Sequence, residues 1–67
     1  MMQRIHIETT IAAERTQYYL SVHGFDSSIL NSGCKYENGK ILEAKEDAIK
    51  LAQSYLDFMG AKHSQEC

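Results

Sequence analysis

An apolar stripe at helical spacing constrains this chain more than any other feature of its sequence. The stripe recurs every three or four positions through the last third of the chain, at Ala44, Ala48, Leu51, Ala52, Tyr55 and Met59. Acidic residues at Glu43, Glu46 and Asp47 stand where a helix dipole favours them, in the first turns. Gly60 follows as a helix terminator. We therefore predict one helix over residues 43–59, which must bury its stripe against the rest of the chain.

The first half of the chain alternates apolar and polar residues with a period of two, which predicts strands. The first predicted strand spans residues 4–13, and its apolar face consists of Ile5, Ile7, Thr9, Ile11 and Ala13. Residues 14–16 interrupt the alternation and predict a hairpin turn. Turns of two or four residues both remain possible, since they preserve the same faces. A second strand is predicted over residues 17–25, with Leu20 and Val22 on the apolar face.

The strongest turn signal in the sequence is Asn38-Gly39, because both residue types tolerate the positive φ of a type I′ hairpin. It predicts short strands over residues 34–37 and 40–42. The expected fold class is α+β: a small antiparallel sheet of three or four strands with one C-terminal helix packed on one face. Residues 1–60 form the predicted domain, and residues 61–67 form a polar C-terminal tail.

A single helix can cover only one face of such a sheet, which leaves the other face open. The predicted open face carries Arg4, His6, Tyr19, His23 and Phe25. One interpretation is an ordinary half-polar surface, and the other is a contact surface, either a homodimer seam or a partner site. The acidic helix start, at Glu46 and Asp47, is a competing contact surface.

No motif in the sequence indicates catalysis, so we predict that the protein is not an enzyme and uses no cofactor. His6 and His23, with Glu8, are candidate metal ligands, but their spacing is not that of a zinc site, and solvated or interface histidines are the better interpretation. Cys34 has no base placed beside it for nucleophilic chemistry. A net charge of −2 argues against non-specific electrostatic binding of nucleic acid. Aromatic side chains on strands leave one alternative, a single-stranded nucleic-acid-binding protein.

Cysteine usage bears on the compartment. The chain of 67 residues has two cysteines, Cys34 and Cys67, fewer than small secreted domains usually carry. Two free thiols in a reduced cytoplasmic protein are the favoured interpretation, and a disulfide tying the tail to the body is the alternative. No apolar run is long enough to span a membrane.

The predicted order of strand, strand, short strand and helix, with the helix opening in Leu42-Glu43-Ala44-Lys45-Glu46-Asp47-Ala48-Ile49, resembles the β-β-β-α core of HicB-like antitoxins. The chain is also similar in type to small phage anti-defence inhibitors of the anti-CRISPR kind. Both resemblances imply binding to another protein. We therefore predict a non-catalytic protein-binding module, an inhibitor or modulator that occludes a larger complex sterically, with a homodimer as a further possibility.

Overall fold

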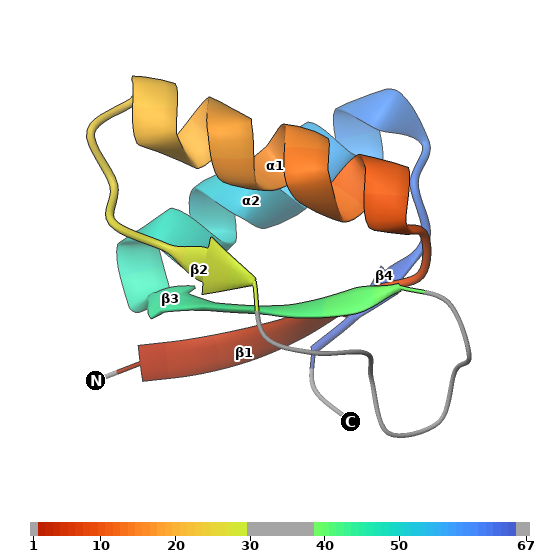
Figure 1. The fold of residues 1–67 in the computed structure, drawn as a ribbon, viewed down its shortest axis with the longest axis horizontal. Coiled ribbons are helices and arrows are strands. Elements are labelled where there is room, and N and C mark those ends of the chain that lie inside the picture. The colour runs from red at the N-terminus through yellow and green to blue at the C-terminus, as the bar shows by residue number, and fades with distance from the viewer. Residues whose placement is uncertain (1, 30–38, 66–67) are drawn as a thin grey trace.

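The computed structural model describes residues 2–29 and 39–65, which form a sheet with two helices packed on it (Figure 1). The elements follow one another as β1 (Met2–Ile7), α1 (Thr10–Val22), β2 (Ser28–Ile29), β3 (Lys40–Lys45), α2 (Glu46–Met59) and β4 (His63–Ser64). The fold is α+β, as the sequence predicts. The prediction of a single C-terminal helix is wrong, because α1 occupies most of the region that was assigned to two strands.

The sheet is antiparallel and has the strand order β2-β3-β1-β4. Its centre is the pairing of β1 with β3, in which Ile5 lies opposite Leu42 and Ile7 opposite Lys40. The two outer strands, β2 and β4, are only two residues long. The predicted antiparallel sheet is therefore confirmed. Its two central strands, β1 and β3, are far apart in the sequence, whereas the prediction paired two consecutive strands.

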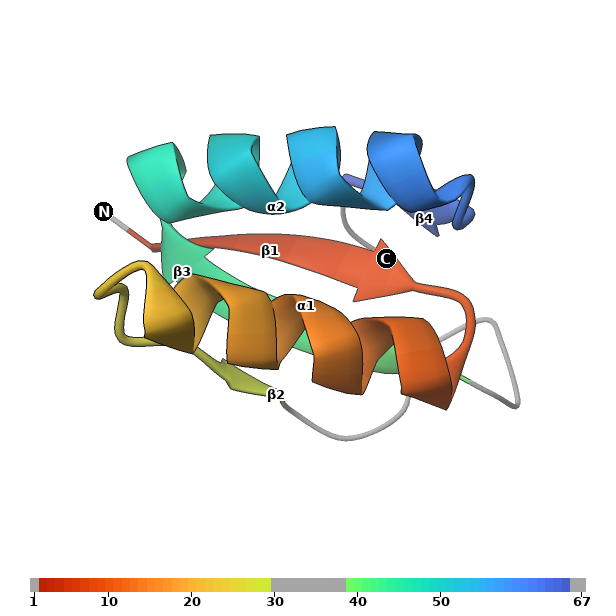
Figure 2. The ribbon, with the colours of Figure 1, turned by 90° about the horizontal axis from the view of Figure 1, so that it is seen from above.

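Both helices cover the same face of the sheet, and the two helices run side by side in opposite directions (Figure 2). Ile5 and Ile7 of β1 point toward the helices and are fully buried in the hydrophobic core, as predicted. Leu42 and Ala44 of β3 join them on the same face. The prediction that helical structure packs on one face of the sheet is correct, but two helices cover that face instead of one.

The segment from Thr10 to Val22 is helical because local signals and core packing agree on a helix. Thr9 caps the helix, and its hydroxyl Oγ1 accepts a hydrogen bond from the amide of Ala12 at 3.2 Å. The face that packs on the sheet is made of small and medium residues at helical spacing: Ala12, Ala13, Thr16 and Leu20. The predicted turn at residues 14–16 is in fact the middle of this helix.

Helix α1 ends in a Schellman motif. The amide of Gly24 donates to the carbonyl of Ser21 at 3.0 Å, and the amide of Phe25 donates to the carbonyl of Leu20 at 2.9 Å. Gly24 adopts a φ of 85°, a conformation that glycine reaches without strain. Gly24 thus follows the end of a helix, within the region over which a strand was predicted.

Helix α2 confirms most of the C-terminal prediction. It ends where predicted, with Gly60 in the left-handed conformation at a φ of 73°. Glu46 and Lys50, four residues apart on the helix, form an ion pair at 3.9 Å. The predicted start at residue 43 is wrong, since β3 continues through Lys45 and places Ala44 in the sheet.

Several other predictions need correction or lie beyond the described chain. Ile11 and Val22, predicted to be in the core, are exposed on α1. The predicted tail over residues 61–67 contributes β4, in which His63 pairs with Ile7 and Ser64 with His6. The predicted strand over residues 34–37, together with Asn38, lies outside the described residues.

The core contains one polar residue whose removal should raise stability. Thr16 is fully buried, and its hydroxyl has no hydrogen-bond partner among the described residues. A buried hydroxyl without a partner costs roughly 1–3 kcal/mol. We expect Thr16→Val, which keeps the shape, to raise the free energy of unfolding by about 1 kcal/mol in urea denaturation.

The same substitution at the helix cap is the matched control. Thr9→Val removes the oxygen that accepts from Ala12, so it should lower stability by about 1 kcal/mol. If Thr16→Val destabilises the protein as Thr9→Val does, the Thr16 hydroxyl is satisfied in solution and its assigned burial is wrong.

Candidate protein-binding surface

The residues predicted to share an open sheet face do not share one. Arg4 and His6 lie on β1, as expected, and face away from the helices, because they alternate with Ile5 and Ile7. The other members of that set lie elsewhere: Tyr19 on α1, His23 at its C-terminal cap and Phe25 just beyond it. The predicted surface is therefore divided between two sides of the molecule.

Tyr19 and Phe25 mainly support the fold. Both are partly buried and pack against the hydrophobic core. Tyr19 stacks on Tyr55 of α2 with ring centroids 4.2 Å apart and an interplanar angle of 3°. The Tyr19 ring also lies against the ring of His23, with centroids 4.4 Å apart and an interplanar angle of 52°. Truncating Tyr19 and Phe25 should thus weaken the packing of the helices, whereas the sheet-face assignment implied that the fold would survive.

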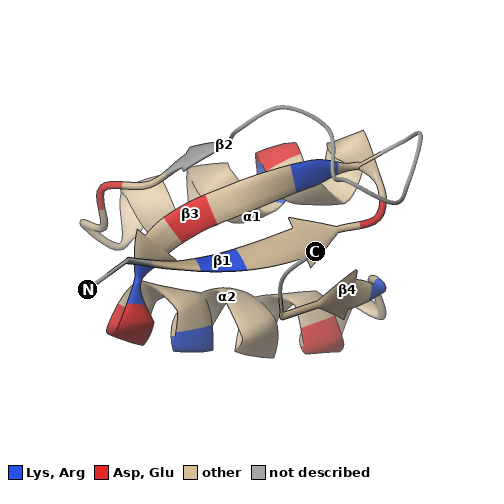
Figure 3. Cartoon of the chain, turned by 90° about the horizontal axis from the view of Figure 1, so that it is seen from below, with Lys and Arg blue, Asp and Glu red and all other residues tan. Residues whose placement is uncertain are grey.

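The sheet face away from the helices is shown in Figure 3. His6 is fully buried there and lies opposite Ile41 of β3, which is also buried. Arg4 is exposed and pairs with Glu43 on the neighbouring strand at 3.5 Å. The prediction that His6 is an exposed member of a contact surface is therefore wrong.

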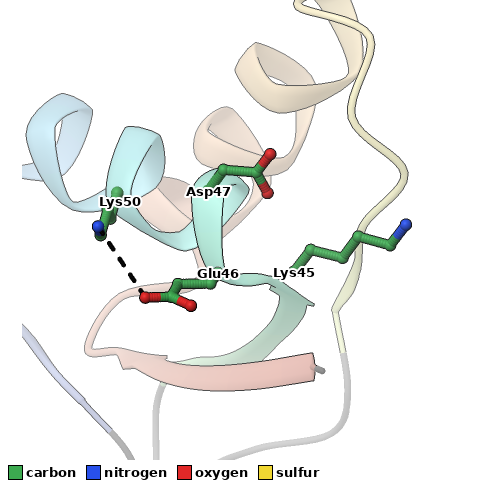
Figure 4. Close-up of a pocket in the computed structure, with 4 residues that line it drawn as sticks. All are labelled: Lys45, Glu46, Asp47 and Lys50. Carbon is green, nitrogen blue, oxygen red and sulfur yellow. Dashed lines mark ion pairs between the residues drawn. The ribbon is translucent and has the colours of Figure 1, made fainter.

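The acidic helix start forms a shallow hollow at the N-terminus of α2, with a volume of about 460 Å³ (Figure 4). Lys45, Glu46, Asp47 and Lys50 line it. The Glu46 carboxylate pairs with Lys50, and the Asp47 carboxylate accepts a hydrogen bond from the amide of Ala48 at 3.0 Å. Both predicted acids are exposed, and each has a partner within its own helix, which leaves Lys45 as the lining charge without an ion pair among the described residues.

The most distinctive exposed surface lies on the helices, on the side away from the sheet. Four large hydrophobic side chains project there, with exposed fractions of 67% at Ile11, 73% at Tyr18, 65% at Val22 and 87% at Phe58. Tyr18 and Val22 are each two residues from the buried Leu20, so they lie on the opposite side of α1. We call these four residues the outer patch.

Sequence reasoning missed the outer patch because it placed three of its members on strands. Ile11, Tyr18 and Val22 are spaced by seven and four positions, which is a single stripe on a helix. Two stripes of α1 are therefore apolar, one facing the sheet and one facing outward. The signal that distinguishes them is residue size, since Ala12, Ala13 and Thr16 allow close packing on the sheet.

Other chemistry finds limited support in the described residues. Within residues 2–29 and 39–65, no group of three His, Cys, Asp or Glu side chains is placed to hold a metal ion. The described strands carry no Phe, Tyr or Trp, so the aromatic platform expected for stacking single-stranded bases is not on this sheet. Cys34 and Cys67 lie outside the described residues. Neither described helix is sufficiently long and apolar to cross a bilayer.

Comparison with known proteins adds no relative. No family model, no curated protein and no solved structure matches this chain. The β-β-β-α order that resembles the HicB-like antitoxins is not the observed order, because α1 stands where the second strand was predicted.

Proposed function

We propose that this protein is a non-catalytic protein-binding module whose contact surface is the outer patch. The observation that supports it most directly is the stripe of Ile11, Tyr18 and Val22 along one exposed side of α1. Single exposed hydrophobic residues are common on protein surfaces, but an aligned set on a small domain is typical of interaction sites.

The neighbouring helix extends this surface. Phe58 of α2 is two residues from the buried Leu56, so it too lies on the side away from the sheet. The stacked pair of Tyr19 and Tyr55 joins the two helices beneath it. Aromatic side chains such as Tyr18 and Phe58 are the usual energetic anchors of protein interfaces.

The mode of action that fits this arrangement is steric. The face that carries the outer patch runs 29 Å along the longest axis of the molecule and 15 Å across the shortest (Figures 1 and 2), so a bound molecule would cover an elongated strip of its target. A cytoplasmic inhibitor or modulator of a larger complex is the role we favour, since the low cysteine content agrees with a reducing compartment. No described cluster of side chains calls for catalysis in this role.

The test removes the aromatic anchors without touching the core. We expect Tyr18→Ser combined with Phe58→Ser to abolish capture of protein partners by the tagged chain from expressing cells. The same variant should abolish binding to those partners in purified form. The melting temperature should change little, because exposed substitutions usually alter stability by less than about 0.5 kcal/mol.

The control tests the competing surface at the acidic helix start. Glu46→Lys combined with Asp47→Lys should leave partner binding intact. If this charge reversal abolishes binding while the Tyr18 and Phe58 variant still binds, the contact surface is the start of α2 and the outer patch is excluded.

A further inference from the structure

Two opposite charges flank the exposed stripe of α1. Successive residues of a helix are about 100° apart, which places Glu14 on one side of the stripe and Arg15 on the other. Both side chains are exposed, and neither takes part in an ion pair between described residues. The outer surface of α1 therefore carries an apolar stripe with an unpaired acid on one flank and an unpaired base on the other.

This arrangement is complementary to itself in one orientation only. When two copies of a helix pack in parallel about a two-fold axis, each flank meets the opposite flank of the second copy. Glu14 would then lie near Arg15 of the second copy, and the contact occurs twice. In the antiparallel orientation each flank meets the same flank of the second copy, so Glu14 and Arg15 lie on flanks that do not meet and cannot pair across the contact.

The apolar residues agree with the parallel orientation. Ile11, Tyr18 and Val22 would each meet their own counterpart at the same level along the two helices, in the manner of an isologous interface. The face that carries the outer patch spans about 29 Å by 15 Å (Figures 1 and 2), which is smaller than the ~800 Å² that each partner buries in a standard interface and fits a weak, concentration-dependent dimer.

We infer that the outer patch binds a second copy of this chain, with the two α1 helices parallel and paired through Glu14 and Arg15. The inference rests on the proposed function, since it names the partner of the same surface. Any other protein that binds the outer patch must compete with this pairing.

Sedimentation equilibrium over a range of concentrations tests the pairing. We expect the full chain to dimerise, and Tyr18→Ser to raise the dimer dissociation constant by at least about tenfold. Glu14→Lys alone and Arg15→Glu alone should each weaken the dimer by about tenfold, because each brings two like charges together in the parallel pair. The double variant Glu14→Lys with Arg15→Glu should restore the wild-type dissociation constant.

The double variant separates the two orientations. In an antiparallel pair Glu14 and Arg15 lie on flanks that do not meet, so the second substitution cannot compensate for the first, and dimerisation without rescue overturns the parallel arrangement. A chain that stays monomeric at millimolar concentration overturns the inference altogether. The proposed function is tested independently of dimerisation, by measuring whether the Tyr18 and Phe58 double variant loses its other protein partners. Circular dichroism of each variant verifies that the fold is retained.

Discussion

Gly39→Ala should leave the protein unfolded or nearly so at room temperature. Gly39 has a φ of 106°, a conformation that residues with a side chain rarely adopt. A Cβ at this position would overlap the carbonyl oxygen of Ile7, and would lie 2.5 Å from the carbonyl oxygen of Glu8 and 2.8 Å from its carbonyl carbon. These are backbone atoms at the end of the central strand β1, so they cannot move without disturbing the pairing of β1 with β3.

The expected loss is large compared with the stability of the domain. At roughly 0.05–0.15 kcal/mol per residue, a chain of 67 residues has about 3–10 kcal/mol of stability. Backbone strain alone costs on the order of 1–3 kcal/mol, and the overlap with β1 adds to it. Thermal melting followed by far-ultraviolet circular dichroism measures the effect.

Gly60→Ala is the matched control for this substitution. Gly60 also has a positive φ, but a Cβ there would meet nothing within 4 Å. It should therefore lose only about 1 kcal/mol, the cost of the left-handed conformation by itself. If the two variants melt at the same temperature, the close approach of Gly39 to β1 does not exist in solution.

Leu56→Ala should cost about 2–5 kcal/mol of unfolding free energy, as cavity-forming substitutions in a core do. Leu56 is fully buried where α2 meets the sheet and α1. The size of the loss follows from both the lost transfer energy and the cavity that the rigid surroundings cannot fill. Urea denaturation monitored by circular dichroism gives the free energy directly.

Leu51→Ala supplies the comparison on the same helix. The sequence places Leu51 at the centre of the helical stripe, but the structure shows it only partly buried against the core. Its truncation should therefore cost clearly less than that of Leu56. Equal losses for the two variants would mean that α2 is rotated about its axis relative to the described packing.

The C-terminal helix was predictable because its local signals and its burial pattern agree. Ala48 and Ala52 of the predicted stripe are on the buried face, whereas Leu51, Tyr55 and Met59 are only partly buried. Gly60 ends the helix by the mechanism that its sequence position indicates. The alternation of Ile5 and Ile7 likewise sets the buried face of β1, and both residues are in the core. Gly39 was expected to need a positive φ, and it has one.

The prediction failed from Thr10 to Val22, where the residues fit two periods at once. Leu20 and Val22 alternate as in a strand, while Ala12, Ala13, Thr16 and Leu20 recur as in a helix. The local helix signals were present in Thr9 as a cap and in the run Ala12-Ala13-Glu14-Arg15. The β-branched and aromatic residues around them favoured the wrong period. With α1 assigned to strands, the outer patch could not be recognised.

By itself the sequence determined the fold class, the antiparallel sheet, the buried face of β1 and the C-terminal helix, because in each of these local preference and hydrophobic pattern point the same way. Only the tertiary structure decided which apolar stripe of α1 is buried. That choice depends on how closely the helix can approach the sheet, and small side chains at Ala12 and Ala13 permit an approach that Ile11 and Tyr18 would prevent. The larger residues are consequently left on the outer side of α1, where they form the surface that we propose binds another protein.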